Sequence, residues 1–132
     1  MAFQCTVVTP EEKLFEGAIT QAIVPAHDGL VGILTNRAPL LVKLGVGPLQ
    51  LDISDTRKEF FFVDGGVAQM KDNRLTILTT EAQRASDIDY EAARAEFEQA
   101  KLMRGTDAQS LERRQHQMQR AMAKEALSQH AR

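Results

Sequence analysis

Residues 48–54 read PLQLDIS, and this stretch is the clearest structural signal in the chain. Its apolar and polar residues alternate without a break, with Leu49, Leu51 and Ile53 set against Gln50, Asp52 and Ser54. A period of two residues places each set on its own face of an extended backbone, as in a β-strand that is buried on one side. The stretch therefore predicts a half-buried strand.

Neighbouring stretches extend this β pattern in both directions. Residues 3–8 (FQCTVV) alternate in the same way, and so do residues 74–80 (RLTILTT). Residues 58–63 (KEFFFV) are apolar on both faces, which indicates a strand that lies between two layers or meets a partner. Turn residues, such as those at 45–48 and 64–66, separate the runs at short intervals. We therefore expect an antiparallel β-sandwich or flattened barrel.

The composition of the chain changes near residue 85. Seven of the eight glycines and all four prolines precede this point, where they punctuate the apolar runs. Beyond it the chain is rich in Ala, Glu, Gln, Arg and Met, which are good helix formers. The sequence thus predicts an α+β fold, with a β-sandwich domain at residues 1–85 followed by a helical hairpin at residues 86–132.

Capping residues mark the boundaries of two helices in the second part. Ser86 is the expected N-cap of the first helix, with Asp89 three residues later as in a capping box. Gly105 ends that helix, and Thr106 with Asp107 begins the second, which runs from about residue 108 to the end. So short a connection predicts an antiparallel pair. The apolar stripe expected on the second helix consists of Leu111, Met118, Ala121, Met122 and Ala126.

The first helix is acidic and the second is basic. Mutual attraction within a solvated hairpin is one explanation of this pattern. The seam between the helices is made largely of alanines, however, and each buried methyl group contributes only about 0.8 kcal/mol. Such a hairpin is marginal by itself, and its methionines adapt to more than one surface, so a second helix that moves between two positions is the other explanation. The basic side chains of the second helix include Arg113, Arg114, Arg120 and Lys124.

Composition argues against several classes of protein. A chain of 132 residues has room for one modest domain with an appendage, and its formal net charge of −2 gives no bulk attraction to nucleic acid or acidic lipid. Cys5 is the only cysteine, which fits a reducing compartment. No apolar run approaches the ~20 residues of a membrane span, and the N-terminus lacks a signal-peptide pattern. We expect a soluble, cytoplasmic protein that does not insert into a membrane.

No catalytic or metal-binding motif stands out. The three histidines form no H-x-x-x-H pair, and C-x-x-C, G-x-S-x-G and phosphate-loop patterns are missing from the sequence. A dyad of Cys5 and His27 and a metal site at His27 and Asp28 are the alternatives, but a core cysteine and a plain turn explain these residues better. The sequence therefore favours a protein without an active site, metal or cofactor of its own.

Three stretches together resemble a known family, the epsilon subunit of the rotary ATP synthases of bacteria and chloroplasts. Residues 7–17 (VVTPEEKLFEG) resemble its opening strand and turn. Residues 28–41 (DGLVGILTNRAPLL) resemble its G-x-x-G-I-L-x-x-x-A-P-L loop, and residues 60–82 (FFFVDGGVAQMKDNRLTILTTEA) its closing segment. The β-then-helices order matches over essentially the whole chain.

The resemblance implies a non-catalytic rotor subunit of the proton-translocating enzyme. Its sandwich would be fixed to the gamma subunit and stand on the c-subunit ring, coupling rotation between ring and catalytic head. Its hairpin would lie down or extend toward the alpha/beta catalytic head, with inhibition of ATP hydrolysis as a further expectation. The subunit would be peripheral, on the cytoplasmic face of the inner membrane or the stromal face of the thylakoid.

The family likeness also suggests interface residues. Residues 28–41 would form the loop that meets the ring, and Arg113, Arg114, Arg120 and Lys124 would face acidic residues of the catalytic head. Many relatives carry an acidic residue in place of Leu30 and a histidine in place of Arg37, so polar pairing with the ring falls to Asp28 or gives way to apolar contact. The candidates for the ring and gamma surfaces are Thr9, Asp28, Gly29, Leu30, Gly32, Arg37 and Val42.

A nucleotide-sensing role is the alternative that the resemblance leaves open. Some relatives bind ATP through an I/L-D-x-x-R-A motif at the start of the first helix. Ile88 and Asp89 keep its opening, but Ala92 stands where the arginine is expected. Arg94 follows two residues later, about 200° around a helix. In this alternative the hairpin would close over ATP.

Overall fold

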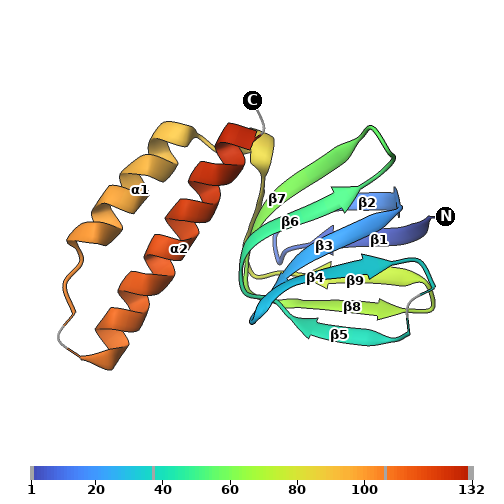
Figure 1. The fold of residues 1–132 in the computed structure, drawn as a ribbon, viewed down its shortest axis with the longest axis horizontal. Coiled ribbons are helices and arrows are strands. Elements are labelled where there is room, and N and C mark those ends of the chain that lie inside the picture. The colour runs from blue at the N-terminus through green and yellow to red at the C-terminus, as the bar shows by residue number, and fades with distance from the viewer. Residues whose placement is uncertain (1, 37, 106, 131–132) are drawn as a thin grey trace.

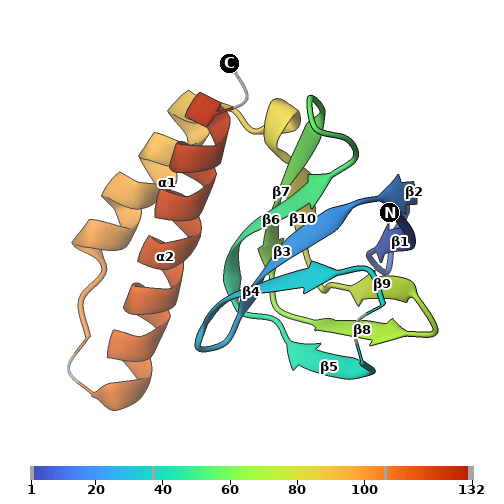
Figure 2. The same cartoon turned by 45° about the vertical axis from the view of Figure 1, so that its right-hand side comes forward.

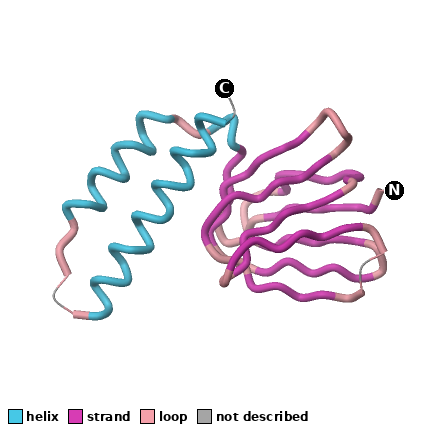
Figure 3. The backbone as a smooth tube through the Cα atoms, viewed as in Figure 1, coloured by secondary structure: helices cyan, strands magenta, loops and turns pink. Residues whose placement is uncertain are grey.

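The computed structural model describes residues 2–36, 38–105 and 107–130. Ten strands form two five-stranded sheets that pack face to face, followed by two helices (Figures 1 and 3). The first sheet has the order β2 (Lys13–Ile19), β1 (Phe3–Val8), β9 (Arg74–Leu78), β8 (Val67–Lys71) and β5 (Leu40–Lys43). The second has the order β10 (Ala82–Arg84), β7 (Lys58–Asp64), β6 (Val46–Asp52), β3 (Gln21–Ala26) and β4 (Gly29–Leu34).

This arrangement confirms the predicted sandwich, with two differences. The two sheets are separate, so the described strands do not close into a barrel. Strand β1 also pairs with β9 in parallel, whereas every other pairing between described strands is antiparallel. The reason is that β2 occupies one edge of β1 as its hairpin partner, which leaves the other edge for a strand that arrives late in the chain.

The sandwich core contains the residues that the alternating patterns predict. Leu49 and Leu51 of β6 are buried, and so are the apolar residues of β1 and β9. Cys5 is fully buried among them, and this burial raises the pKa of its thiol to about 12. The burial confirms the assignment of Cys5 to the core, and the thiol stays protonated at neutral pH.

Strand β7 is apolar on both faces because it serves two cores. Phe61 and Val63 face the sandwich core, whereas Phe62 and Phe60 belong to a second cluster on the outer side of the sheet. Both Phe61 and Phe62 have no exposed surface. The prediction of a strand between two layers is therefore confirmed, and the outer layer is the helical hairpin (Figure 2).

Residues 28–41 do not form one loop. They contain the whole of β4, whose six residues span about 20 Å. Asp28 therefore lies at one end of the sandwich, where the His27 amide donates to the Lys43 carbonyl. Asn36 lies at the opposite end, where its amide donates to Asn73 Oδ1 at 2.9 Å. The expectation of a single loop at one end is thus wrong, because the glycine-containing segment Gly29–Leu34 pairs fully with β3.

The helices are α1 (Tyr90–Leu102) and α2 (Ala108–His130), and they run antiparallel as predicted (Figure 1). The N-cap of α1 is Asp89 rather than Ser86, since residues Ala85–Asp87 form a single 3₁₀ turn and Ile88 returns to an extended backbone. At the start of α2, Asp107 Oδ1 accepts from the Ser110 amide at 2.8 Å. Neither helix, over its described residues, combines the length and apolar character needed to cross a bilayer.

Candidate functional site at the hairpin contact

Helix α2 lies between α1 and the outer face of the second sheet, against β6 and β7 (Figures 1 and 2). We call the contact that α2 makes with this sheet and with α1 the hairpin contact. It has an apolar cluster of its own, separate from the sandwich core. The buried members of this cluster are Phe62, Ala85, Ile88, Ala93 and Leu127, and the partly buried members are Val46, Phe60 and Ala123.

The buried face of α2 differs from the predicted stripe. Ala121 is buried as expected, but Leu111 and Met122 are 52% and 56% exposed, and Ala126 is exposed as well. Leu127 and Ser128 are buried instead, and the Ser128 hydroxyl donates to the Glu125 carbonyl at 2.8 Å. The helix meets two partners at once, so its buried surface is wider than a single stripe and lies toward its C-terminal half.

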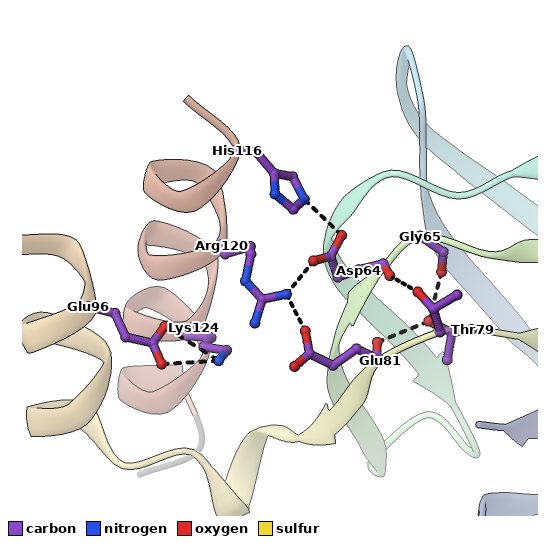
Figure 4. A network of polar contacts seen from close by, with 9 residues as sticks. Asp64, Gly65, Thr79, Glu81, Glu96, His116, Arg120 and Lys124 are labelled. Atoms are coloured by element: carbon purple, nitrogen blue, oxygen red, sulfur yellow. Dashed lines mark hydrogen bonds and ion pairs between the residues drawn. The ribbon is translucent and has the colours of Figure 1, made fainter. Parts of the chain in front are cut away.

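A network of charged side chains joins α2 to the sandwich (Figure 4). Arg120 donates to the carboxylates of both Asp64, at the end of β7, and Glu81, just before β10. The two acidic residues are held side by side because the Asp64 amide donates to the Glu81 carbonyl at 3.0 Å. His116 Nε2 lies 3.1 Å from Asp64 Oδ1. The side chains of Arg120 and Asp64 are only 15% and 16% exposed, so water screens this pair weakly.

The charges of this network reinforce one another. The hydrogen bond from Arg120 lowers the pKa of Glu81, and the carboxylates of Glu81 and Asp64 together raise the pKa of Arg120. Because the pKa of Glu81 is lower in the folded chain, the pairing contributes its full stability above the ordinary value of 4.5 and loses it as the pH falls through the lowered value. The pairing of Arg120 with Glu81 therefore persists at every pH near neutrality.

Lys124 connects all three layers of the contact. Its Nζ lies 3.4 Å from both carboxylate oxygens of Glu96 on α1 and 5.2 Å from the centre of the Phe62 ring. The guanidinium carbon of Arg120 lies 5.3 Å from the centre of the same ring. Two cations of α2 thus contact one buried aromatic side chain of β7, an arrangement that stabilises the contact beyond burial alone.

The four basic residues expected to face the catalytic head are placed differently from one another. Arg120 and Lys124 lie in the hairpin contact. Arg113 is exposed, and Arg114 is half-buried with its guanidinium 3.5 Å from the Lys101 carbonyl. Sequence reasoning did not identify Phe62, Asp64 and Glu81 as their partners. The signal that could have found them is the outward apolar face of residues 58–63, which is followed directly by an acidic residue.

The ring and gamma candidates do not form one continuous surface. Thr9 and Asp28 lie in turns at the same end of the sandwich. Leu30 is 65% exposed on the outer side of β4, and Val42 is half-buried with its side chain packed on the sandwich core. Gly29 and Gly32 are the first and fourth residues of β4. Arg37 lies outside the described residues.

The nucleotide candidates have structural roles instead. Ile88 is 8% exposed in the cluster under α2. The Asp89 carboxylate accepts from the Glu91 amide at 3.0 Å as the helix cap. Arg94 is exposed, and its Nη1 lies 3.3 Å from the Tyr90 hydroxyl. Over the described residues no group of three or more His, Cys, Asp and Glu side chains could hold a metal ion.

We expect Arg120→Ala to weaken the hairpin contact by about 2 kcal/mol. Breaking a fully buried ion pair costs about 3–5 kcal/mol, and the expected loss lies below this range because Glu81 is 49% exposed. The equilibrium constant for docking of α2 on the sandwich should fall about 30-fold. Hydrogen exchange measures this change, because α2 amides around residue 121 should exchange faster. Arg113→Ala removes the same charge from an exposed site of the same helix and should change nothing. Equal exchange rates in the two variants would show that the network does not hold the hairpin.

Comparisons with known proteins agree with this architecture. The family model described as "ATP synthase, Delta/Epsilon chain, beta-sandwich domain" matches residues 2–85. The ATP synthase epsilon chain of Leptospira interrogans is 35% identical over 106 residues, which cover 80% of this chain and 83% of the relative. The chloroplastic epsilon chain of Nephroselmis olivacea is 35% identical over 101 residues, or 76% of this chain and 75% of the relative.

Two solved structures have the same fold at low sequence identity. A chain of the Euglena gracilis mitochondrial ATP synthase superposes with a TM-score of 0.84 at 20% identity, covering 95% of this chain and 80% of that one. A chain of the Tetrahymena thermophila enzyme gives 0.69 at 14% identity, covering 98% and 96%. The family match and the curated relatives extend this likeness from fold to family. The chain therefore belongs to the epsilon-chain family of ATP synthase.

Proposed function

We propose that this chain is a central-stalk subunit with no active site of its own, in which residues 1–85 are a binding platform and residues 86–132 a regulatory element. The observation that supports this most strongly is the hairpin contact. Its two anchoring cations, Arg120 and Lys124, are also residues suited to bind an acidic surface elsewhere. The related Euglena and Tetrahymena structures are described as assemblies that include a c-ring, which supports a place in the stalk.

The platform offers two surfaces of different character. One is the sandwich end that carries Thr9, Asp28 and Gly29, which we assign to the c-subunit ring. The other is the open edge formed by β4 and β5, the last strands of their sheets, which we assign to the gamma subunit. On the outer sides of these two strands, Leu30 and Leu34 of β4 and Leu41 of β5 are 65%, 53% and 69% exposed. Exposed leucines on these neighbouring edge strands are the apolar surface that we expect a partner to cover.

The regulatory element is docked in this structure. Release of α2 would uncover the apolar cluster around Phe62 and would free the cations of Arg120 and Lys124. These cations, with Arg113 and Arg114, would then be available to acidic residues of the alpha/beta catalytic head. Docking to the sandwich and binding to the head therefore compete for the same side chains, so each state excludes the other.

Cross-linking tests the assignment of the two surfaces. Because Cys5 is buried and its thiol stays protonated, a cysteine introduced on the surface is the reactive one. In the assembled synthase, Asp28→Cys should cross-link to the c-ring. Lys58→Cys, exposed at the opposite end of the sandwich, is the matched control and should not. Ring cross-links from the control alone would reverse the proposed orientation, and failure of the chain to co-purify with a gamma subunit would refute the stalk role.

ATP sensing is not favoured, and we expect that the isolated chain does not bind ATP. Asp89 is engaged as a helix cap, and Arg94 is exposed and lies beside Tyr90. A ligand that binds only the folded state raises the melting temperature in a concentration-dependent way. Millimolar ATP should therefore leave the melting temperature unchanged. A saturable rise, lost in Arg94→Ala but kept in Arg113→Ala, would restore the sensor function.

A further inference from the structure

An apolar cavity of about 270 Å³ lies between α2 and the outer face of the second sheet. Ile23, Leu30 and Phe60 form part of its wall on the strand side, and Ala123 and Ala126 form part of it on the helix side. The space exists because the alanines of α2 are too short to reach the larger side chains of the sheet. The cavity is partly open, so a molecule can enter it from solvent.

The lining determines which molecules this cavity can hold. It contains no charged residue, and its polar side chain, Gln50, already donates its amide to Asp52 Oδ1 at 2.8 Å. A charged ligand would lose its hydration here without replacement, whereas an apolar ligand would cover apolar surface that otherwise meets water. An engineered apolar cavity of about 150 Å³ is sufficient to bind benzene. We propose that this cavity binds a small, uncharged and predominantly apolar molecule.

Such binding would be linked to the position of the hairpin. The helix supplies part of the wall, so the site is complete only when α2 is docked. A ligand that binds one of two states shifts the population toward that state by its difference in affinity. An apolar ligand therefore holds the hairpin on the sandwich. This linkage extends the regulatory role proposed above, but binding itself needs no other subunit.

Indole is a suitable probe for the full-length isolated chain. In the wild-type chain, nuclear Overhauser contacts should connect indole protons with the Phe60 ring and the methyl groups of Ala123 and Ala126. Indole should also raise the melting temperature in a saturable way. Ala126 is an exposed residue of α2 that lines the cavity, so Ala126→Leu narrows the open side of the cavity with a good helix former and should weaken binding at least tenfold. Ala92→Leu makes the same change at an exposed site of α1 outside the cavity and should bind as the wild type does.

The wild-type contacts decide the proposal even if Ala126→Leu disturbs docking. Their absence at millimolar indole, or contacts to residues outside the cavity only, would overturn it. Equal indole affinity in Ala126→Leu and Ala92→Leu would overturn it as well. These experiments use the isolated chain. A negative indole result therefore does not affect the proposed stalk role. Evidence against the stalk role would likewise not affect the indole contacts.

Discussion

Phe62→Ala should release the helical hairpin while the sandwich stays folded. The Phe62 ring is fully buried at the centre of the hairpin contact and is flanked by Arg120 and Lys124. Removing a buried phenylalanine ring costs about 3–5 kcal/mol, and nearly all of this loss falls on the contact because the ring points away from the sandwich core. The docking equilibrium should fall more than about 100-fold.

Phe61→Ala is the matched comparison, since it makes the same change one residue away on the opposite face of β7. Phe61 is equally buried but belongs to the sandwich core, where it meets Phe15 edge to face at 6.5 Å between ring centres. This variant should lower the melting temperature of the sandwich. Hydrogen exchange separates the outcomes, because Phe62→Ala should expose α2 amides and leave β6 amides protected. If the amides of both α2 and β6 lost protection in Phe62→Ala, the hairpin and the sandwich would unfold as one unit.

Gly66→Ala should strongly destabilise the sandwich. Gly66 has φ of +113°, and a Cβ placed there would lie 2.1 Å from the Leu78 carbonyl oxygen and 2.7 Å from Thr79 Cα. Both obstacles are backbone atoms of the neighbouring segment, so the clash cannot be relieved by a side-chain rotation. The Gly66 carbonyl also accepts from the Leu44 amide at 2.9 Å, which ties this turn to β5. We expect a loss of more than about 4 kcal/mol, at the upper limit for single substitutions.

Gly65→Ala provides the comparison for that substitution. Its φ is +81°, but the nearest atom to a new Cβ is the side-chain oxygen Thr80 Oγ1 at 3.3 Å, which needs to shift by only a few tenths of an ångström. The expected cost is about 1–2 kcal/mol, from the backbone conformation alone. Chemical denaturation of the two variants measures the difference. If Gly66→Ala were no less stable than Gly65→Ala, the Gly66 turn would not lie as close to Leu78 and Thr79 as the structure places it.

The strands of the sandwich could be predicted because one-sided burial leaves a local pattern. Leu49 and Leu51 alternate with half-buried polar residues, and the structure buries the two leucines as the sequence indicates. The two-faced apolar run at residues 58–63 also indicated a second layer, which is the helical hairpin. In each case the evidence lies within a few residues of the strand it describes.

Pairing between distant segments left no comparable pattern. The parallel neighbour of β1 lies about seventy residues further along the chain, and only the competition for the edges of β1 decides it. Arg120 and Asp64 are 56 residues apart, and the charge of the helix alone did not identify the carboxylates that bind it. The N-cap shifted from Ser86 to Asp89 because Ile88 is drawn into the cluster beneath α2, which is a tertiary effect.

The assembled enzyme gives the most direct test of the regulatory hairpin. ATP hydrolysis should be measured for a synthase that carries the full-length chain and for one whose chain ends at residue 104, which removes α2 with its cations Arg113, Arg114, Arg120 and Lys124. If α2 leaves the sandwich to bind the catalytic head and restrain rotation, the truncated enzyme should hydrolyse ATP faster. The difference should shrink at high salt, which screens exposed ion pairs. Equal hydrolysis by the two enzymes at low salt would contradict the account.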